Sequence, residues 1–387
     1  MESAVGREDL MTNTELNNLA APFPYFGGKS KVRDEVWRRF GKVDRYVEPF
    51  FGSGAVMLAN PYWQDTKEIV NDLNHFISNC WRSLRHDPEA VAYWCDYPTI
   101  EIETHLWHIW LVNEGIERIK ACEWDAGHYD AEVAGKWLYG MANWIGSHYA
   151  AGTGCWTRES LKQAAESGTY NHREIVSALS GDGQGVNRQR PHLGDDGRGV
   201  NRKLPHLGND GQGVNRKLPH LGNDGRGDES GTLFPKNEPL YQYIRRLSER
   251  LIEVDVCCGD WLRICKPAVT SAAKNSTVNN TAGIFFDPPY STEAGRSSVY
   301  THEDFSVAHA VRKWCVNESD NPRMRIALCG YDVEHKELED YGFEPFTWSA
   351  SGGYSGIGKK SAAGLANKHR EVIWFSASCR SNEGRLF

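Results

Sequence analysis

The segment Asp287 to Tyr290 places an acid, two prolines and an aromatic residue directly after the apolar run Gly283 to Phe286. The Asp287 carboxylate and the Pro288 carbonyl, which the prolines hold rigid, are two adjacent hydrogen-bond acceptors. Such a pair can hold both hydrogens of a planar exocyclic amine and localise the nitrogen lone pair. Tyr290 offers an aromatic face on which a flipped base can stack. The alternative is a proline-rich turn capped by Asp287.

A second candidate site is the glycine turn Gly52-Ser53-Gly54, which follows the β-rich run Arg45 to Glu48. Glycines there let the backbone approach a ligand closely. Asp72 ends the next strand-like run, where a carboxylate can accept both ribose hydroxyls of an adenosine-containing cofactor. The turn lacks the third glycine of the dinucleotide fingerprint, which disfavours a nicotinamide cofactor. The alternative is a simple turn with a solvated Asp72.

Strands that alternate with helices are expected to position both sites. The predicted sheet is mostly parallel, has helices on both faces and one reversed edge strand, and binds its ligand at the carboxyl ends of the strands. Helical spacing without a strand pattern over 100–119 and 131–145 predicts an inserted helical subdomain. The expected strands are 45–48, 67–72, 252–258, 283–286, 325–329, 345–348 and 371–375, and the expected helices include 29–40, one starting at 55–59, and 238–251.

Residues 181–227 contain a tandem repeat with a period of 14 residues, in which Gly-Val-Asn-Arg begins at 185, 199 and 213. Its content of Gly, Asn, Asp and Pro cannot build a core, so we expect a flexible surface insertion. The repeat carries eight Lys and Arg residues against five Asp residues. A weak contact with DNA is therefore the alternative role.

The composition limits the classes of protein that the chain can represent. The net charge of -7 argues against tight non-specific coating of DNA but allows a local basic groove. The 10 cysteines form no Cys-x-x-Cys pair, so we expect reduced, buried thiols and no metal. The sequence has no run of 18 apolar residues and no apolar N-terminal leader, which predicts a cytoplasmic protein without a membrane span.

Four motifs occur in an order that resembles the D12 class of DNA adenine-N6 methyltransferases, which includes the Dam methylase and many phage and restriction-modification methylases. The motifs are Pro24 to Lys29, the turn Phe51 to Gly54, Gly259-Asp260-Trp261, and Asp287 to Tyr290. The resemblance covers about residues 22–85 and 238–376. The part between corresponds by position to the target-recognition domain of the family. The four motifs are specific together, although no single one is.

The resemblance implies an α/β fold, a Rossmann-like S-adenosylmethionine-dependent methyltransferase sheet with an inserted helical target-recognition domain. The implied activity transfers a methyl group from S-adenosylmethionine to N6 of a flipped adenine in double-stranded DNA. A cognate restriction endonuclease is the candidate partner. The expected organisation is a flexible tail (1–20), a cofactor-binding half (21–87), a helical target-recognition insertion (88–180), a repeat insertion (181–230) and a catalytic half (231–387).

The resemblance also implies a role for each matching residue. The target adenine is held by Asp287, Pro288, Pro289 and Tyr290. Asp72 binds the cofactor's ribose, and Trp261 replaces the Phe that the family usually places against the cofactor's adenine. The implied cofactor site comprises Tyr25, Lys29, Phe51, Gly52, Gly54, Asp72, Asp260, Trp261 and Asp287.

Simpler roles are open for several of these residues. Lys29 is alternatively a solvated helix start, Asp260 a helix N-cap, and Tyr25 and Trp261 core aromatics. The acceptor geometry also serves other planar amines, so the alternatives are methylation of cytosine N4, RNA or a protein glutamine. A catalytically silent DNA- or cofactor-binding relative belongs to a different class and predicts cofactor binding without methyl transfer.

Overall fold

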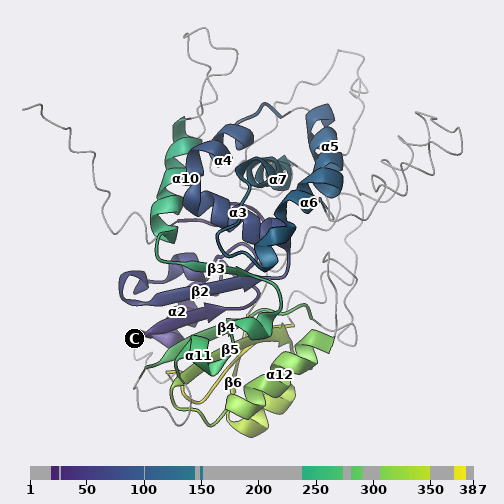
Figure 1. Ribbon diagram of the computed structural model, residues 1–387. Helices are drawn as coiled ribbons and strands as arrows, with labels where there is room; N and C mark the ends of the chain where they lie inside the picture. Colours follow the sequence, from purple (N-terminus) through teal and green to yellow (C-terminus); the bar gives the residue numbers. More distant parts are fainter. Residues whose placement is uncertain are drawn as a thin grey trace, which may run out of the picture.

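The computed structural model describes residues 19–25, 28–99, 101–143, 149–150, 238–272, 280–290, 306–348 and 370–380. The expected tail up to residue 18, the repeat insertion and the Gly/Ser-rich segment 349–360 lie outside these residues. Seven strands form one sheet in the order β3-β2-β1-β4-β5-β7-β6 (Figure 1). Their bounds are β1 Arg45–Glu48, β2 Lys67–Asp72, β3 Asp255–Cys258, β4 Ala282–Phe286, β5 Met324–Tyr331, β6 Glu344–Thr347 and β7 Glu371–Phe375.

The strands β3, β2, β1, β4 and β5 are all parallel, with pairs such as Val47↔Ile69 and Val47↔Ile284. β7 is antiparallel to both of its neighbours, β5 and β6. The predicted reversed strand therefore exists, but its predicted place at the edge is wrong. Every residue of β7 is buried, whereas β6 alternates between half-buried and exposed residues and contains Pro345. The apolar strand thus lies inside the sheet, and the proline-containing strand forms its edge.

Helices cover both faces of the sheet, as expected for parallel strands. One face packs against α2 (Arg33–Phe40), α3 (His75–His86) and α10 (Glu238–Leu251), through side chains such as Tyr46 and Phe285. The other face packs against α11 (Pro267–Thr270), α12 (Ser306–Glu318) and the short helix η7 (Lys336–Tyr341), through side chains such as Val47 and Ile284. The alternation of these side chains along each strand therefore builds two separate cores.

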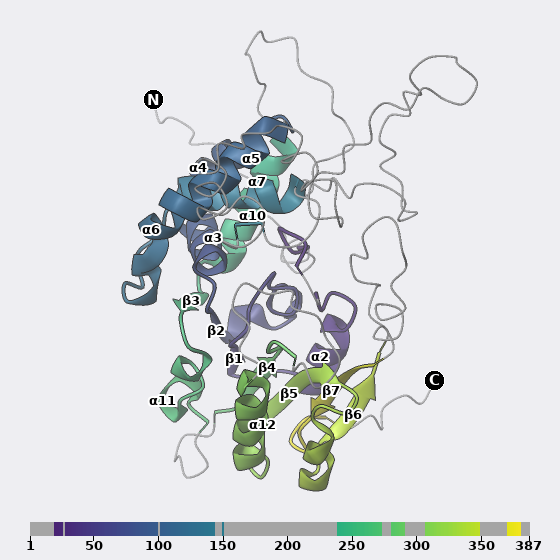
Figure 2. The same ribbon diagram turned by 90° about the vertical axis from the view of Figure 1, so that its right-hand side faces the viewer.

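A cluster of helices lies beyond the β3 side of the sheet in both views (Figures 1 and 2). It comprises α3, α4 (Pro88–Cys95), α5 (Glu101–Trp110), the π-turn η3 (Leu111–Gly115), α6 (Ile116–Ile119), η4 (Lys120–Glu123), α7 (Ala131–Asn143) and α10. The expected helical character of 100–119 and 131–145 is thus present, and the boundary of a recognition domain stays a prediction. Within the described ranges, no helix is long and apolar enough to cross a membrane.

Two helices are shorter than their patterns suggested. The expected helix 29–40 begins only at Arg33, after a turn in which the Lys29 carbonyl accepts the N–H groups of Val32 and Arg33, each at 3.0 Å. The expected helix at 55–59 is only the 3-10 turn η1 (Met57–Ala59). Asn60 is followed by Pro61, and a proline disfavours helical conformation in the residue before it. The remaining short helices are η2 (Trp63–Asp65) and η5 (Trp261–Arg263).

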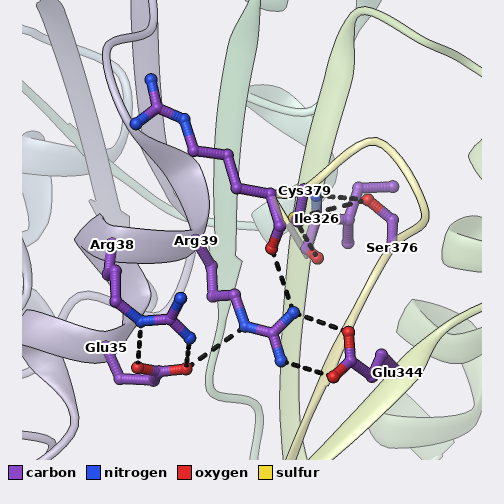
Figure 3. Close-up of polar contacts among 8 residues, drawn as sticks. Glu35, Arg38, Arg39, Ile326, Glu344, Ser376 and Cys379 are labelled. Carbon is purple, nitrogen blue, oxygen red and sulfur yellow. Dashed lines mark hydrogen bonds and ion pairs between the residues drawn. The ribbon is translucent and has the colours of Figure 1, made fainter. Parts of the chain in front are cut away.

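Arg39 connects α2 to the edge strand β6 of the sheet (Figure 3). Its guanidinium donates to both carboxylate oxygens of Glu344 on β6, at 2.6 and 2.8 Å, and to Glu35 at 3.2 Å. It also donates to the carbonyl of Arg380 and lies 5.0 Å from the Phe375 ring centroid. Arg39 is 1% exposed and Glu344 45%, so the pair links a buried cation to an acid that reaches solvent.

Candidate active site

The strands β3, β2, β1 and β4 are parallel, so their carboxyl ends lie side by side at one end of the sheet, which we call the site edge. Asp72 ends β2, Glu48 ends β1, and Asp260 and Asp287 lie just beyond the ends of β3 and β4. Neighbouring strands are about 4.8 Å apart, so the ends of β2 and β4 are separated by about 10 Å. A ligand the size of a nucleoside can span that distance. The topology thus brings the two acids of the predicted sites to one edge.

The glycine turn after β1 has backbone angles that favour glycine. The φ angles are +50° at Gly52 and +67° at Gly54, in the left-handed region. A Cβ atom on Gly52 would lie 2.8 Å from the Tyr25 ring, and one on Gly54 2.8 Å from the Phe51 ring. The turn therefore packs directly against Tyr25, which joins two of the sequence motifs in space.

Asp72 is buried at the end of β2 and faces this turn. Its carboxylate accepts the backbone N–H groups of Gly52 and Asn74, each at 2.9 Å. Burial raises the pKa of Asp72 from 3.8 to about 6, although these two hydrogen bonds lower it. No cationic side chain among the described residues forms an ion pair with it. A buried, ionisable acceptor that is fixed by backbone donors is suited to hydroxyl donors of a ligand.

Asn71, which the sequence analysis did not single out, holds three strand ends together. It lies on β2, and its side-chain amide donates to the carbonyl of Pro49 at 3.1 Å and to that of Gly259 at 2.9 Å. These carbonyls belong to the turns after β1 and β3. The only sequence signal was its position immediately before Asp72.

Asp260 and Trp261 have the simpler roles that the sequence left open. The Asp260 carboxylate accepts the N–H of Leu262 at 2.8 Å and caps the 3-10 helix η5. Trp261 is buried, with its ring centroid 6.2 Å from that of Phe50 and 6.0 Å from that of Phe286. Both residues lie at the site edge, and their contact with a cofactor stays a prediction.

Asp287 and Lys29 form an ion pair at the end of β4. Lys29 Nζ lies 2.8 Å from Asp287 Oδ2, and the side chains are 4% and 18% exposed, respectively. Burial lowers the pKa of Lys29, but the attraction of Asp287 and Glu371 more than compensates, so the pKa lies above its ordinary value. Lys29 is thus a charged, buried residue, and the Asp287 side chain beside it is partly exposed.

Tyr290 lies behind Asp287 rather than on the surface. Its hydroxyl donates to Glu371 Oε2 at 2.8 Å and lies 3.3 Å from Asp287 Oδ1. Its ring is buried, with an edge-on contact to Tyr331 at a centroid distance of 4.9 Å. Burial raises the pKa of Tyr290 well above 10, so the hydroxyl keeps its proton. Stacking of Tyr290 on a target base stays a prediction.

Two buried acids near Asp287 were missing from the predicted site. Glu48 accepts the Tyr46 hydroxyl at 2.8 Å, and burial raises its pKa well above 4.5. Glu371 is the first residue of β7. The sequence feature that could have placed Glu371 in the site is its position as the first residue of a strand whose other residues are all apolar. Groups of three or more His, Cys, Asp or Glu side chains that could hold a metal ion do not occur in the described part of the chain.

The sheet order, the reversed β7, the glycine turn after β1 and the acids at the ends of β2 and β4 define a Rossmann-like methyltransferase. The family model of the D12 class N6 adenine-specific DNA methyltransferases matches residues 25–103. The match covers 79 of the 387 residues and supports adenine-specific DNA methylation as the activity of the enzyme. The matched segment contains Tyr25, Lys29, the glycine turn and Asp72, and ends before Asp287. No curated protein matches the sequence.

Proposed function

We propose that the protein transfers a methyl group from S-adenosylmethionine to N6 of an adenine that is flipped out of double-stranded DNA. The observation that carries this proposal is the partly exposed Asp287 carboxylate at the end of β4. Buried Lys29 forms an ion pair with it, and it lies at the carboxyl ends of the parallel strands, as Asp72 does. The predicted endonuclease partner stays a prediction, because no feature of the described residues bears on it.

The residues present fit the proposed cofactor. Asp72 offers a buried carboxylate that forms no ion pair with any described residue and can accept hydrogen bonds from ribose hydroxyls. The left-handed glycines let the turn pack directly against the Tyr25 and Phe51 rings, which fixes the position of its backbone beside Asp72. When bound, the cofactor supplies an activated methyl group on a sulfonium, so the protein's task is placement.

The chain's own groups would prepare the target amine. Asp287 accepts one N6 hydrogen, and the Pro288 carbonyl accepts the other. The nitrogen lone pair then leaves conjugation with the ring and points at the methyl group. Lys29 holds Asp287 and balances its charge. A proper alignment of nitrogen and methyl carbon lowers the barrier chiefly by removing translational and rotational entropy.

The test replaces Asp287 with Ala and with Asn. We expect each variant to lose at least about a hundredfold in the rate of methyl transfer, as typical for a group that acts on the reacting proton. The measurement uses tritiated S-adenosylmethionine and bacterial genomic DNA that lacks N6-methyladenine. The matched control is Asp65→Asn, because Asp65 forms a lysine ion pair of equal length, 2.8 Å, with exposed Lys42. Unchanged transfer in Asp287→Ala would contradict the proposed function.

A further inference from the structure

Asp287, Tyr290 and Glu371 form a continuous hydrogen-bonded chain from the site edge into the protein. Asp287 Oδ1 lies 3.3 Å from the Tyr290 hydroxyl oxygen, which lies 2.8 Å from Glu371 Oε2. We call these three residues the acid–tyrosine chain. The first residue belongs to the end of β4 and the last to β7, so the chain crosses above β5, the strand that separates them.

The surroundings of Glu371 require an explanation beyond packing. Residues 372–375 of β7 are all apolar and buried, and Glu371 is itself buried. A buried carboxylate is costly unless it is paired and hydrogen-bonded. Among the described residues, Asp287, Lys29 and Cys329 are charged or titratable groups that lie close to Glu371 or Tyr290. Of these groups, the Lys29 ammonium attracts both the Asp287 and the Glu371 carboxylates.

Methylation of a primary amine creates a surplus proton. When the N6–CH3 bond forms, the nitrogen carries the methyl group, two hydrogens and a positive charge until one proton leaves. Asp287 is the acceptor at hand, but it must be ionised again before the next turnover. Lys29 already carries its full set of protons and cannot take another. A second base within reach of Asp287 would solve this problem.

We propose that Tyr290 and Glu371 relay the proton released from N6 away from Asp287, an inference that rests on the proposed function. The N6–H bond breaks and an O–H bond forms on Asp287 Oδ1. That proton then passes to the Tyr290 oxygen while the original Tyr290 proton passes to Glu371 Oε2. Tyrosine ends as it began, Asp287 is ionised, and Glu371 is a neutral acid that later loses the proton to water.

The relay makes Glu371 a specific target for substitution. Glu371→Gln keeps the side-chain length and an acceptor oxygen for Tyr290, but it cannot take up a proton. We expect the steady-state rate of methyl transfer to fall at least tenfold, because Asp287 must be re-ionised between turnovers, with the single-turnover rate and the cofactor affinity changed by less than twofold. Tyr290→Phe, which lacks the connecting hydroxyl, should lose a similar factor. The double variant should be no slower than the slower single variant, because both changes break one relay.

The decisive readout is the dependence of the steady-state rate on the fraction of deuterium in the solvent. The substrates are tritiated S-adenosylmethionine and bacterial genomic DNA that lacks N6-methyladenine. Wild type should give a curved dependence, because two protons move together, and both single variants a linear one. A purely structural role for Glu371 would lower stability without changing this curve. Glu344→Gln, on the exposed edge strand β6, is the control and should retain the curvature.

Three outcomes would overturn the relay. They are a Glu371→Gln steady-state rate within twofold of wild type, a linear dependence in wild type, or losses that multiply in the double variant. If Asp287→Ala abolishes transfer while Glu371→Gln leaves the steady-state rate and the curvature intact, the proposed function stands and the relay fails. If wild type transfers no methyl group to DNA, the proposed function fails and the relay with it.

Discussion

Asp72 lies at the carboxyl end of β2 and Asp287 just beyond that of β4, on the same side of the sheet. Their surroundings nevertheless give the two carboxylates different properties. Asp287 has a lysine partner at 2.8 Å, whereas the donors to Asp72 within the described ranges are backbone N–H groups. Without a cation, burial dominates and raises the pKa of Asp72 to about 6. The difference matters near neutral pH, where Asp72 begins to take up a proton.

The raised pKa of Asp72 predicts pH-dependent cofactor binding. Ribose hydroxyls donate best to the ionised carboxylate, so affinity for S-adenosylmethionine should be constant above pH 7. It should fall about tenfold for each pH unit below 6. Asp72→Asn should bind weakly at every pH and lose this dependence. Calorimetric titration between pH 5 and 8 measures it, with exposed Asp255→Asn as the control. A pH-independent affinity in wild type would exclude Asp72 as the ribose acceptor.

The same raised pKa has the opposite effect on folding. The neutral form of Asp72 is the one that burial favours, so its contribution to stability is complete below the unfolded pKa near 3.8. That contribution is lost as pH rises through about 6. We therefore expect the cofactor-free protein to gain nothing from ionisation of Asp72. The acid is retained at the expense of stability, as binding groups often are.

Sequence reasoning predicted residues whose role is local and missed those whose role depends on distant contacts. Asp287 follows a strand and Gly52 sits in a turn, and both patterns are visible within a few residues. Glu371 lies 81 residues from Tyr290, and Asn71 reaches Gly259 188 residues away. Lys29 was predicted from its motif, but its partner Asp287 is 258 residues distant. Such partners follow from the order of strands, which the sequence alone did not determine.

At the scale of elements, the run of β-rich segments predicted every strand, and Lys67–Asp72 and Glu371–Phe375 match their predicted bounds. The reversed strand was predicted at the edge of the sheet, whereas β7 lies between β5 and β6. Pro345 in β6 could have indicated the edge, since a proline cannot donate to a neighbouring strand. The helices α3 and α12 received no specific prediction. Helix packing against two faces depends on tertiary contacts that a local pattern does not contain.

Arg39 should stabilise the attachment of α2 to the sheet. Arg39→Met removes the hydrogen bonds to Glu344, Glu35 and the Arg380 carbonyl, and we expect it to lower the free energy of unfolding by about 1–3 kcal/mol. Glu344 reaches solvent, which limits the loss. Chemical denaturation measures the change, and Arg38→Met, at the more exposed neighbour, is the control. Surface substitutions typically change the free energy of unfolding by up to about 0.5 kcal/mol. A change no larger than that in Arg39→Met would refute this assignment.

At the scale of the whole molecule, the part after the repeat is anchored independently of it. Arg250 on α10 forms a fully buried ion pair with Glu68 on β2, at 2.6 Å, and donates to the Met57 carbonyl. The same guanidinium lies 4.9 Å from the Trp63 ring centroid. These contacts position α10 on the core through residues that all lie outside the repeat.

Deletion of residues 181–227 should therefore leave a cooperatively folded protein. Its thermal midpoint should remain within about 3 °C of the wild-type value, because no contact of α10 with β2 is removed. Differential scanning calorimetry measures this midpoint, and methyl transfer to DNA reports whether the repeat contributes to substrate binding. Loss of cooperative unfolding would show that the repeat belongs to the core, contrary to the sequence-based prediction.

The most direct test of the account is sequencing with modified-base detection of DNA from cells that express the wild-type protein or Asp287→Ala. The host should lack adenine methylation of its own. We predict N6-methyladenine at one recurrent sequence with the wild-type protein and none with Asp287→Ala. Methylation of another base by the wild-type protein, or N6-methyladenine that persists in Asp287→Ala, would contradict the assigned chemistry.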